Sequence, residues 1–248
     1  MGRSRRNKLY FYEDDDDDED FSYTPSFSGM DGWISQHKAI KPKNDVQATY
    51  IKALEDPSIP IVVAVGSAGT GKTFVANSFA MERLKSNTYQ KLVITRPMIS
   101  VDERQSFGAL PGDVQSKMMP FLLPIYDVIY RYISPGKLQS LISKGTIEIC
   151  SLLHMRGRSF ENSLIIADEM QNATPAQMLM LLTRIGENSK LIINGDPVQH
   201  DRGNEVNGLV DLLNRLDKSP SNDIAVIKFQ EMHIERHPII KRILALYK

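Results

Sequence analysis

The sequence predicts an α/β domain with a mainly parallel sheet and helices on both of its faces. Three observations lead to this fold class. Short, continuous apolar runs recur along the chain, which is typical of parallel strands buried on both faces. Segments with the 3.6-residue period of amphipathic helices separate these runs. Hydrophobic residues make up 42% of the chain, which is enough for a substantial core.

The predicted elements follow one another from about residue 44. The strands share an apolar run and are expected at 61–65, 91–95, 146–150, 164–167, 190–193 and 224–229. The helices share the helical period and are expected between Asn44 and Pro57, at 73–85, after Thr174, at 206–216 and at 238–247. Thr174 forms a capping box with Gln177 at the start of its helix. A further helical stretch is expected to be interrupted by Pro120 and Pro124.

The net charge of zero conceals two parts of opposite sign. Residues 1–31 carry four basic and nine acidic residues, and the remainder carries a net charge of +5. The first part has no apolar periodicity, so we expect a disordered acidic tail at 1–31 and a single domain at 32–248. A basic body favours nucleic acid as a partner, while the tail would compete with that partner, steer assembly or serve only for solubility.

Cysteine content and hydropathy indicate in which cellular compartment the protein is expected. The single cysteine, Cys150, excludes an intramolecular disulfide and fits a reducing environment. No apolar run approaches the ~18 residues of a membrane span, and the N-terminus lacks the apolar stretch of a signal peptide. We therefore expect a cytoplasmic protein without a membrane partner.

A glycine-rich segment predicts a phosphate-binding loop. Its residues fit the pattern G-x-x-x-x-G-K-[ST] in full: Gly66, Ser67, Ala68, Gly69, Thr70, Gly71, Lys72 and Thr73. The segment follows an apolar strand and opens a helix, so its backbone N–H groups would surround phosphate oxygens at a helix N-terminus. Lys72 would reach the β- and γ-phosphates of ATP, and Thr73 would bind Mg²⁺. A glycine-rich turn with an incidental lysine is the alternative.

Two adjacent acids follow the predicted strand 164–167. Asp168 would hold the Mg²⁺ through its water shell, and Glu169 would polarise the attacking water. A carboxylate beside the magnesium ligand favours hydrolysis over phosphoryl transfer to a metabolite. An ordinary acidic loop that caps the next helix remains the alternative.

Two glutamines complete the expected nucleotide site. Gln199 follows the strand 190–193, at the same edge of the sheet, and would bind the γ-phosphate or the attacking water. Its alternative is an exposed amide in a Gly-Asp-Pro turn. Gln47 precedes the loop on the first helix and would pair with adenine, unless it is a solvated helix residue.

Taken together, eight segments resemble the PhoH-like family of P-loop ATPases, over about residues 44–247. The matching segments are Gln47, 66–73, 95–97, 108–112, 155–158, 168–174, 182–186 and 195–199. The family usually has alanine where this chain has Met170. The resemblance implies ATP binding and hydrolysis in a RecA-like domain that is similar to the first motor domain of superfamily 1 helicases. Short stand-alone members occur in bacteriophages, which would place this chain in the cytoplasm of a host cell.

Basic and aromatic residues at strand ends favour a nucleic-acid partner. Arg96, Arg156 and Arg158 would contact the backbone of a single strand, and the family's proposed RNA-related roles favour RNA. Alternatively, these arginines pair with Asp102, Glu103 or Glu161. The aromatic residues that would stack on bases, or else pack in the core, are Trp33, Phe107 and Tyr126.

The length of the chain allows one RecA-like domain, although the helicases that it resembles have two. Superfamily 1 helicases use two RecA-like domains, and this body supplies one. The arginine that neutralises the γ-phosphate would therefore come from the same domain or from another subunit. The second case favours a homo-oligomer, a hexamer in particular. Arg236 is the first candidate and Arg184 the second, with a surface salt bridge as the alternative for Arg236.

Three functions fit these residues. The leading one is an ATPase motor on single-stranded nucleic acid. The second is an ATP-dependent oligomeric switch or assembly factor that binds a protein without translocation. The third, a small-molecule kinase, is disfavoured by Glu169 beside Asp168 and by the lack of a lid motif.

Overall fold

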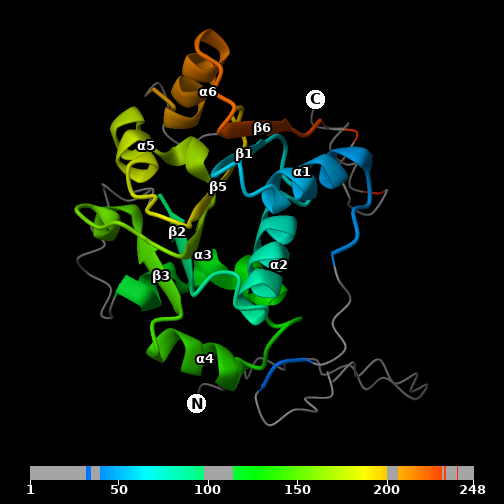
Figure 1. The fold of residues 1–248 in the computed structure, drawn as a ribbon, viewed down its shortest axis with the longest axis vertical. Coiled ribbons are helices and arrows are strands. Elements are labelled where there is room, and N and C mark those ends of the chain that lie inside the picture. The colour runs from blue at the N-terminus through cyan, green and yellow to red at the C-terminus, as the bar shows by residue number, and fades with distance from the viewer. Residues whose placement is uncertain are drawn as a thin grey trace, which may run out of the picture.

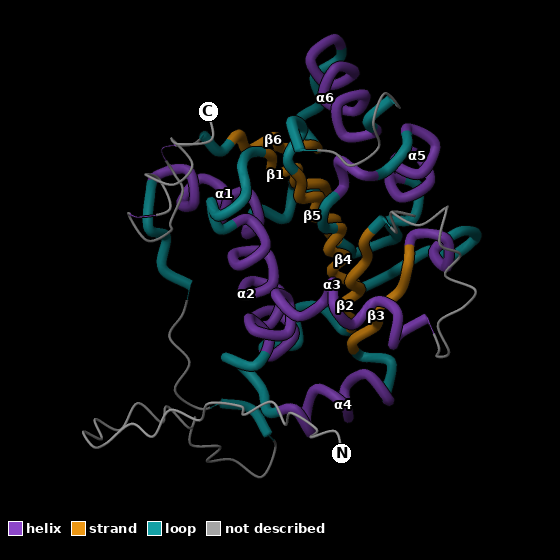
Figure 2. The backbone as a smooth tube through the Cα atoms, turned by 180° about the vertical axis from the view of Figure 1, so that it is seen from behind, coloured by secondary structure: helices purple, strands orange, loops and turns teal. Residues whose placement is uncertain are grey.

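Six parallel strands form one sheet in the computed structural model, which describes residues 32–34, 40–97, 114–199, 206–230, 232 and 239. The strands are β1 (Ile61–Val65), β2 (Lys91–Arg96), β3 (Ile147–Ser151), β4 (Ser163–Ala167), β5 (Lys190–Gly195) and β6 (Ile224–Lys228). Their order across the sheet is β3-β2-β4-β5-β1-β6, and Figure 2 shows them stacked in this order. Because β1 and β4 flank β5, the loops that follow these three strands meet at one edge of the sheet.

Helices cover both faces of this sheet. The helices are α1 (Asp45–Glu55), α2 (Lys72–Lys85), α3 (Val114–Ile129), α4 (Pro135–Ser143), α5 (Pro175–Leu182) and α6 (Gly208–Lys218), with short 3₁₀ turns η2 (Leu152–Met155) and η3 (Met170–Asn172). Helices α1 to α4 contribute to one hydrophobic core, whereas α5, α6 and both 3₁₀ turns contribute to the other. Figure 1 shows α1 and α2 on the side of the sheet opposite to α5 and α6.

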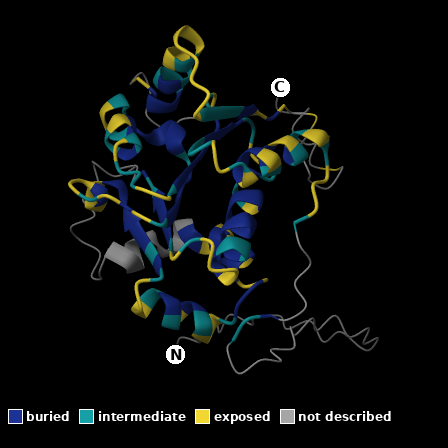
Figure 3. Cartoon of the chain, in the orientation of Figure 1, coloured by how far each residue is buried: buried dark blue, intermediate teal, exposed yellow. Residues whose placement is uncertain are grey.

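Alternating side chains of each strand divide the core between the two faces. Val62 and Ala64 of β1 belong to the core under α1 and α2, whereas Val63 and Val65 belong to the core under α5 and α6. In Figure 3 the inner strands are dark blue between helices with exposed outer faces, whereas the edge strand β6 is mostly of intermediate burial. This double burial explains why the strands have continuous apolar sequences.

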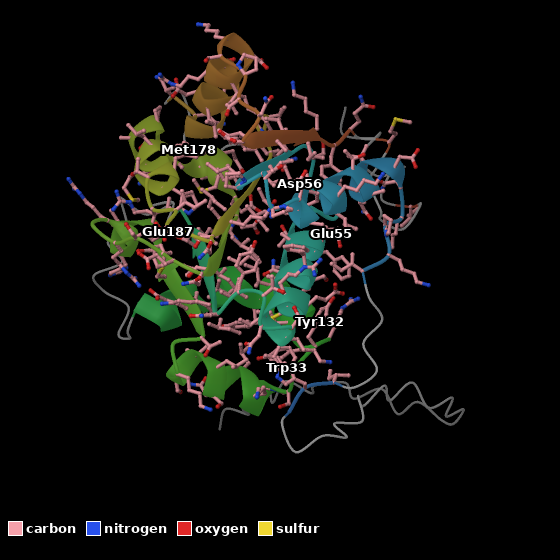
Figure 4. The ribbon with its side chains drawn as sticks, viewed as in Figure 1. Trp33, Glu55, Asp56, Tyr132, Met178 and Glu187 are labelled. Carbon is pink, nitrogen blue, oxygen red and sulfur yellow. The ribbon has the colours of Figure 1, made fainter. Side chains whose placement is uncertain are left out.

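Residues 32–34 contact the connection between α3 and α4. Trp33 forms an isolated antiparallel bridge with Ile133, and the backbone N–H of Ile34 donates to the carbonyl of Tyr132 at 2.8 Å. Trp33 lies beside Tyr132 in Figure 4. Its ring is partly buried against the core and faces the ammonium groups of Lys85 and Lys137, which supports the core-packing alternative for this residue.

The fold class is confirmed, and the strands agree with their predicted ranges to within two residues. The capping box of Thr174 and Gln177 is also present. The acidic tail at 1–31 lies outside the described residues, and of the predicted helix 238–247 only Ile239, which is helical, is described. Within the described part of the chain, no helix is both long and apolar enough to cross a membrane.

The expectation that prolines interrupt the helical stretch is wrong. Helix α3 continues through Pro120 and Pro124. Each proline removes one helical hydrogen bond at a cost of about 3 kcal/mol. Burial of Leu122, Ile125 and Ile129, which are at most 1% exposed, offsets this cost because the three side chains fill the core beside α2.

Candidate nucleotide site

The loop at residues 66–73 connects β1 to α2 and requires glycine at two positions. Gly66 has φ = 140°, and a Cβ there would lie 2.2 Å from the carbonyl oxygen of Phe229. Gly71 has φ = 90°, and its Cβ would lie 2.8 Å from Nε2 of Gln47. These positive φ angles are strained for other residues, so the sequence pattern and the loop conformation require each other.

Lys72, at the start of α2, points back across the loop. Its ammonium donates to the carbonyls of Gly66 and Ser67, the latter at 2.9 Å. The residue is 8% exposed, and burial lowers the pKa of the ammonium, an effect opposed by Asp196 and, less strongly, by Asp168 and Glu169. The ammonium is thus a buried donor held by loop carbonyls, which phosphate oxygens would replace.

Asp168, directly after β4, faces the same loop from the neighbouring part of the sheet. The hydroxyl of Thr73 donates to its carboxylate, 3.1 Å and 3.2 Å from the two oxygens. The residue is 6% exposed, and burial raises the pKa of its carboxyl to about 6, with a further contribution from Glu169. Thr73 and Arg96 act in the opposite direction. Such a carboxylate would be stabilised by a cation.

The residues around Asp168 fit Mg²⁺ bound together with a nucleotide. The Thr73 hydroxyl and the Asp168 carboxylate offer oxygen ligands at one point. The described residues contain no group of three or more His, Cys, Asp or Glu side chains that would hold a metal by themselves. This agrees with the preference of Mg²⁺ for one or two protein ligands together with waters and phosphate oxygens.

Glu169 leaves the strand in the left-handed conformation, with φ = 55°. Its carboxylate accepts a hydrogen bond of 2.6 Å from Nε2 of Gln171, whose Oε1 accepts one of 3.1 Å from the backbone N–H of Asp196. The sequence assigned no role to Gln171. Gln171 lies within the segment 168–174 that resembles the family, and this was its signal in the sequence.

A cavity of about 330 Å³ joins these groups, a volume in the usual range of ligand pockets. The residues that line it are Ala68, Gly69, Gly71, Lys72, Thr73, Phe74, Pro124, Asp168, Glu169, Gly195, Asp196 and Gln199. Gln199 lines this cavity, as its position after β5 predicts, and it is also exposed in the turn after Asp196, as the alternative expects. Its contact with the γ-phosphate stays a prediction. Phe74, Pro124 and Asp196 were missed; Pro124 arrives from α3 only through tertiary folding.

Gln47 is a buried part of the loop's surroundings. It is 4% exposed, which excludes a solvated helix glutamine. Nε2 donates to the carbonyl of Thr70 at 3.1 Å, and Oε1 accepts from the backbone N–H of Lys43 at 2.9 Å. The amide thus joins α1 to the loop. Each end retains one further hydrogen-bonding position, and adenine recognition by this residue remains a prediction.

Helix α1 makes a second contact with the sheet below the loop. The hydroxyl of Tyr50 donates to Oδ1 of Asn194 on β5 at 3.0 Å, and its ring packs edge-on against Phe229. Nδ2 of Asn194 is buried with no hydrogen-bond partner. The Asn194 side chain nevertheless acts on the Asp168 carboxyl, whose pKa it lowers, so it lies beside the centre of the site.

Among the predicted arginines that the structure describes, Arg96 acts on this site through its charge. It ends β2, and its charge lowers the pKa of Asp168. The carbonyl of the preceding Thr95 accepts from the backbone N–H of Asp168 at 3.0 Å, which ties the two strand ends together. Arg156 is exposed after η2. Arg236 lies outside the described residues.

Arg158 and Arg184 lie at the opposite edge of the sheet, so the structure does not bring them to the site of their own chain. Arg158 forms a bidentate pair with Glu148 near the start of β3, which was not among its expected partners. Two of those partners, Asp102 and Glu103, lie outside the described residues. Arg184 donates to the carbonyls of Met180 and Arg158 at 3.1 Å and 2.9 Å. Helix α5 runs back across the sheet and carries Arg184 away from the loop.

Of the two remaining aromatic candidates, the structure describes Tyr126. Tyr126 is 6% exposed and packs against Tyr130, with ring centroids 6.0 Å apart. This supports the core-packing alternative for Tyr126. Phe107 lies outside the described residues.

A parallel sheet with a glycine-rich loop after β1, a lysine and threonine at the start of α2, and an Asp-Glu pair after β4 defines a P-loop NTPase-like protein. The model of the family described as "PhoH-like protein" matches residues 39–248, and the chain belongs to this family.

Curated relatives agree with this assignment. A PhoH-like protein of Synechocystis sp. is 38% identical over 209 residues, covering 84% of this chain and 62% of its own length. A PhoH-like protein of Bacillus subtilis is 34% identical and covers 98% of this chain and 72% of its own length. Protein PhoH of Escherichia coli is 37% identical and covers 84% and 58%. The chain thus spans about 60% of several relatives that it matches.

Among solved structures, helicases show a weak likeness. The helicase domain of Pyrococcus furiosus Hef aligns with a TM-score of 0.42 and 14% identity, over 81% of this chain and 40% of its own. Pif1 helicase from Candida albicans aligns with a TM-score of 0.39 and 13% identity, over 84% and 44%. At these scores the likeness supports no conclusion about activity.

Proposed function

We propose that the protein binds and hydrolyses ATP with Mg²⁺ and that single-stranded nucleic acid, RNA in particular, is its partner. The observation that carries the ATPase is the buried Asp168 carboxylate, which lies against Thr73 and beside Glu169 in the cavity of the glycine-rich loop. A buried carboxyl with a pKa raised to about 6 is costly unless a cation binds to it.

Each residue has a role in this reaction. The loop N–H groups and Lys72 would bind the β- and γ-phosphates, Thr73 would bind Mg²⁺, and Asp168 would hold the metal through its water shell. The metal would neutralise charge on the phosphate oxygens. Glu169 accepts the proton of the water whose oxygen bonds to the γ-phosphorus, while the bond to the β-phosphate oxygen breaks and ADP leaves. Further roles are adenine binding by Gln47 and γ-phosphate contact by Gln199.

The nucleic-acid partner rests on charge and position. Residues 32–248 carry +5, and Arg96 lies at the edge of the sheet where the nucleotide would bind. Hydrolysis near Arg96 would alter the surroundings of any strand bound there. The rival function, a switch that binds a protein without translocation, uses the same ATPase site.

ATPase rates with and without single-stranded RNA or DNA at low salt test the proposal. We expect stimulation by the strand, decreasing as salt rises because the contacts are electrostatic. Lys72→Ala is the control that removes nucleotide-dependent activity. An ATPase that ignores both nucleic acids would support the switch, and consumption of ATP only with a metabolite would support a kinase.

The proposal includes a homo-oligomer, a hexamer in particular, in which Arg236 completes the site of a neighbouring subunit. Mixing Lys72→Ala subunits with Arg236→Ala subunits should then restore part of the activity, because some interfaces combine two intact contributions. A monomer in sedimentation experiments, both with and without ATP and Mg²⁺, would exclude the ring.

A further inference from the structure

Gln171 occupies a bridging position that the functions proposed above do not use. It is 3% exposed and lies behind the cavity, outside the group of residues that line it. One end of its amide binds the Glu169 carboxylate at 2.6 Å, and the other end binds the backbone N–H of Asp196 at 3.1 Å. It therefore connects the end of β4 with the end of β5.

The chemistry of the two partners fixes the orientation of this amide. A backbone N–H only donates, so the Gln171 oxygen must face Asp196. An ionised carboxylate only accepts, so the Gln171 nitrogen must face Glu169. Glutamate at position 171 would satisfy the first partner and repel the second, and an apolar side chain would satisfy neither.

The surroundings leave the amide little freedom. A Cβ on Gly195 would lie 2.8 Å from Oε1 of Gln171, so glycine at this strand end gives the amide its space. The short turn η3 keeps Gln171 close to Glu169, because the N–H of Asn172 donates to the Glu169 carbonyl at 3.1 Å. By contrast, Glu169 is only half-buried, and its long side chain would otherwise adopt several rotamers in the cavity.

We infer that Gln171 is a positioning residue, which holds the Glu169 carboxylate against the attacking water and links its position to the Gly195–Gln199 turn. The inference rests on the proposed ATPase. Through this link, a movement of the turn that carries Gln199 would be transmitted to the carboxylate that accepts the proton.

The test compares Gln171→Met with wild type and with Gln139→Met, a matched change on the exposed surface of α4. We expect kcat to fall about tenfold or more in Gln171→Met, because small misplacements of reacting groups are costly. KM and the Kd for a fluorescent ATP analogue should stay within about threefold, because Gln171 lies behind the cavity lining. Gln171→Glu should also lose activity although it keeps the shape of the side chain. Gln139→Met should behave as wild type.

A double-mutant cycle separates positioning from a general structural role. Gln171→Met should have no further effect on single-turnover hydrolysis in a Glu169→Gln background, because its action passes through that carboxylate. Additive losses, or a Gln171→Met enzyme with wild-type kcat while Glu169→Gln is inactive, would overturn this inference alone. Wild-type kcat in Glu169→Gln would instead overturn the base assignment and this inference with it.

Discussion

The sheet has a carboxyl edge, where its parallel strands end, and an amino edge, where they begin. The two edges differ in the groups that surround their buried charges. At the carboxyl edge, burial lowers the pKa of Lys72 and raises that of Asp168 to about 6. At the amino edge, burial likewise lowers the pKa of the Lys190 ammonium, to about 8, and this ammonium donates to three carbonyls, those of Ala53, Asp56 and Ile59, at 3.2, 2.7 and 2.6 Å.

An ion-paired cluster completes the amino edge. Glu148 binds Arg158 in bidentate fashion and Lys91 at 2.6 Å, and Arg158 lies over the ring of Phe160. Hydrogen bonds from Arg158 and Lys91 lower the pKa of Glu148 to about 2. Lys190, Glu148 and Arg158 thus have protein partners of opposite polarity, whereas at the carboxyl edge Asp168 and Glu169 are two carboxylates side by side at a cavity, where a bound cation would stabilise them. The comparison suggests that charge is buried for stability at one edge and for binding at the other.

Among the substitutions that test the difference between the two edges, Glu169→Gln should have the largest effect, which is a loss of ATP hydrolysis. The amide cannot accept the proton of the attacking water, so kcat should fall about 100- to 10,000-fold while nucleotide binding persists. Steady-state rates and equilibrium binding of an ATP analogue measure the two quantities. Glu161→Gln, an exposed change near the amino edge, is the matched control and should keep wild-type kcat. Equal kcat values in the two variants would remove the distinction between the edges.

Asp168→Asn should stabilise the protein in the absence of ligands. The folded-state pKa of about 6 exceeds the ordinary value of 3.8, so the folded protein retains a proton that the unfolded chain has lost. Stability therefore falls as pH rises from about 4 to 6, and the loss persists at neutral pH. Asparagine does not ionise, so the variant should gain up to about 3 kcal/mol at pH 7 and little at pH 4.

Urea unfolding at several pH values measures this effect. Adding ATP with Mg²⁺ should stabilise wild type and have a much smaller effect on Asp168→Asn, because a ligand stabilises only the state that binds it. A variant that is less stable than wild type at pH 7 without ligands would show that the carboxylate is satisfied by the protein alone.

Most elements that the local sequence determines were predicted, whereas an element that depends on contacts between distant parts of the chain was not. Strands β1 and β4 were predicted because burial on both faces requires an apolar residue at every position. The start of α4 was missed although Ser134 caps the helix and Pro135 occupies its first turn, a local signal. Helix α3 was misjudged because its continuity depends on burial against α2 rather than on local propensity.

The residues of the candidate site also form two groups, one that the local sequence predicts and one that depends on tertiary contacts. Lys72, Thr73 and the Asp168–Glu169 pair follow from spacing within a loop and a strand end. Pro124 and Gln171 required the folded chain, since their partners come from other elements. The location of Arg184 could have been deduced, because a helix of eight residues after β4 returns the chain to the amino edge.

Glu148→Gln should reverse the sign seen for Asp168→Asn. The Glu148 carboxyl has a folded-state pKa of about 2, below the ordinary value of 4.5, so its ion pairs stabilise the protein above about pH 4.5 and are lost as pH falls toward 2. The side chain is 23% exposed, and after solvent screening we expect a loss of about 1–2 kcal/mol at pH 7. Urea unfolding measures the loss, and kcat should not change because the cluster lies at the amino edge.

Arg184→Ala should have the smallest effect of these substitutions. It tests whether Arg184, the second arginine candidate, has only a structural role at the amino edge. The substitution removes hydrogen bonds to the carbonyls of Met180 and Arg158, at a cost of about 1 kcal/mol in unfolding free energy, because these bonds are partly exposed to solvent. Since Arg184 lies at the amino edge of its own chain, kcat at saturating ATP should stay at the wild-type value. A large loss of kcat without a loss of stability would mean instead that this arginine enters the nucleotide site of a neighbouring subunit, and the amino edge would then be a catalytic surface as well as a structural one.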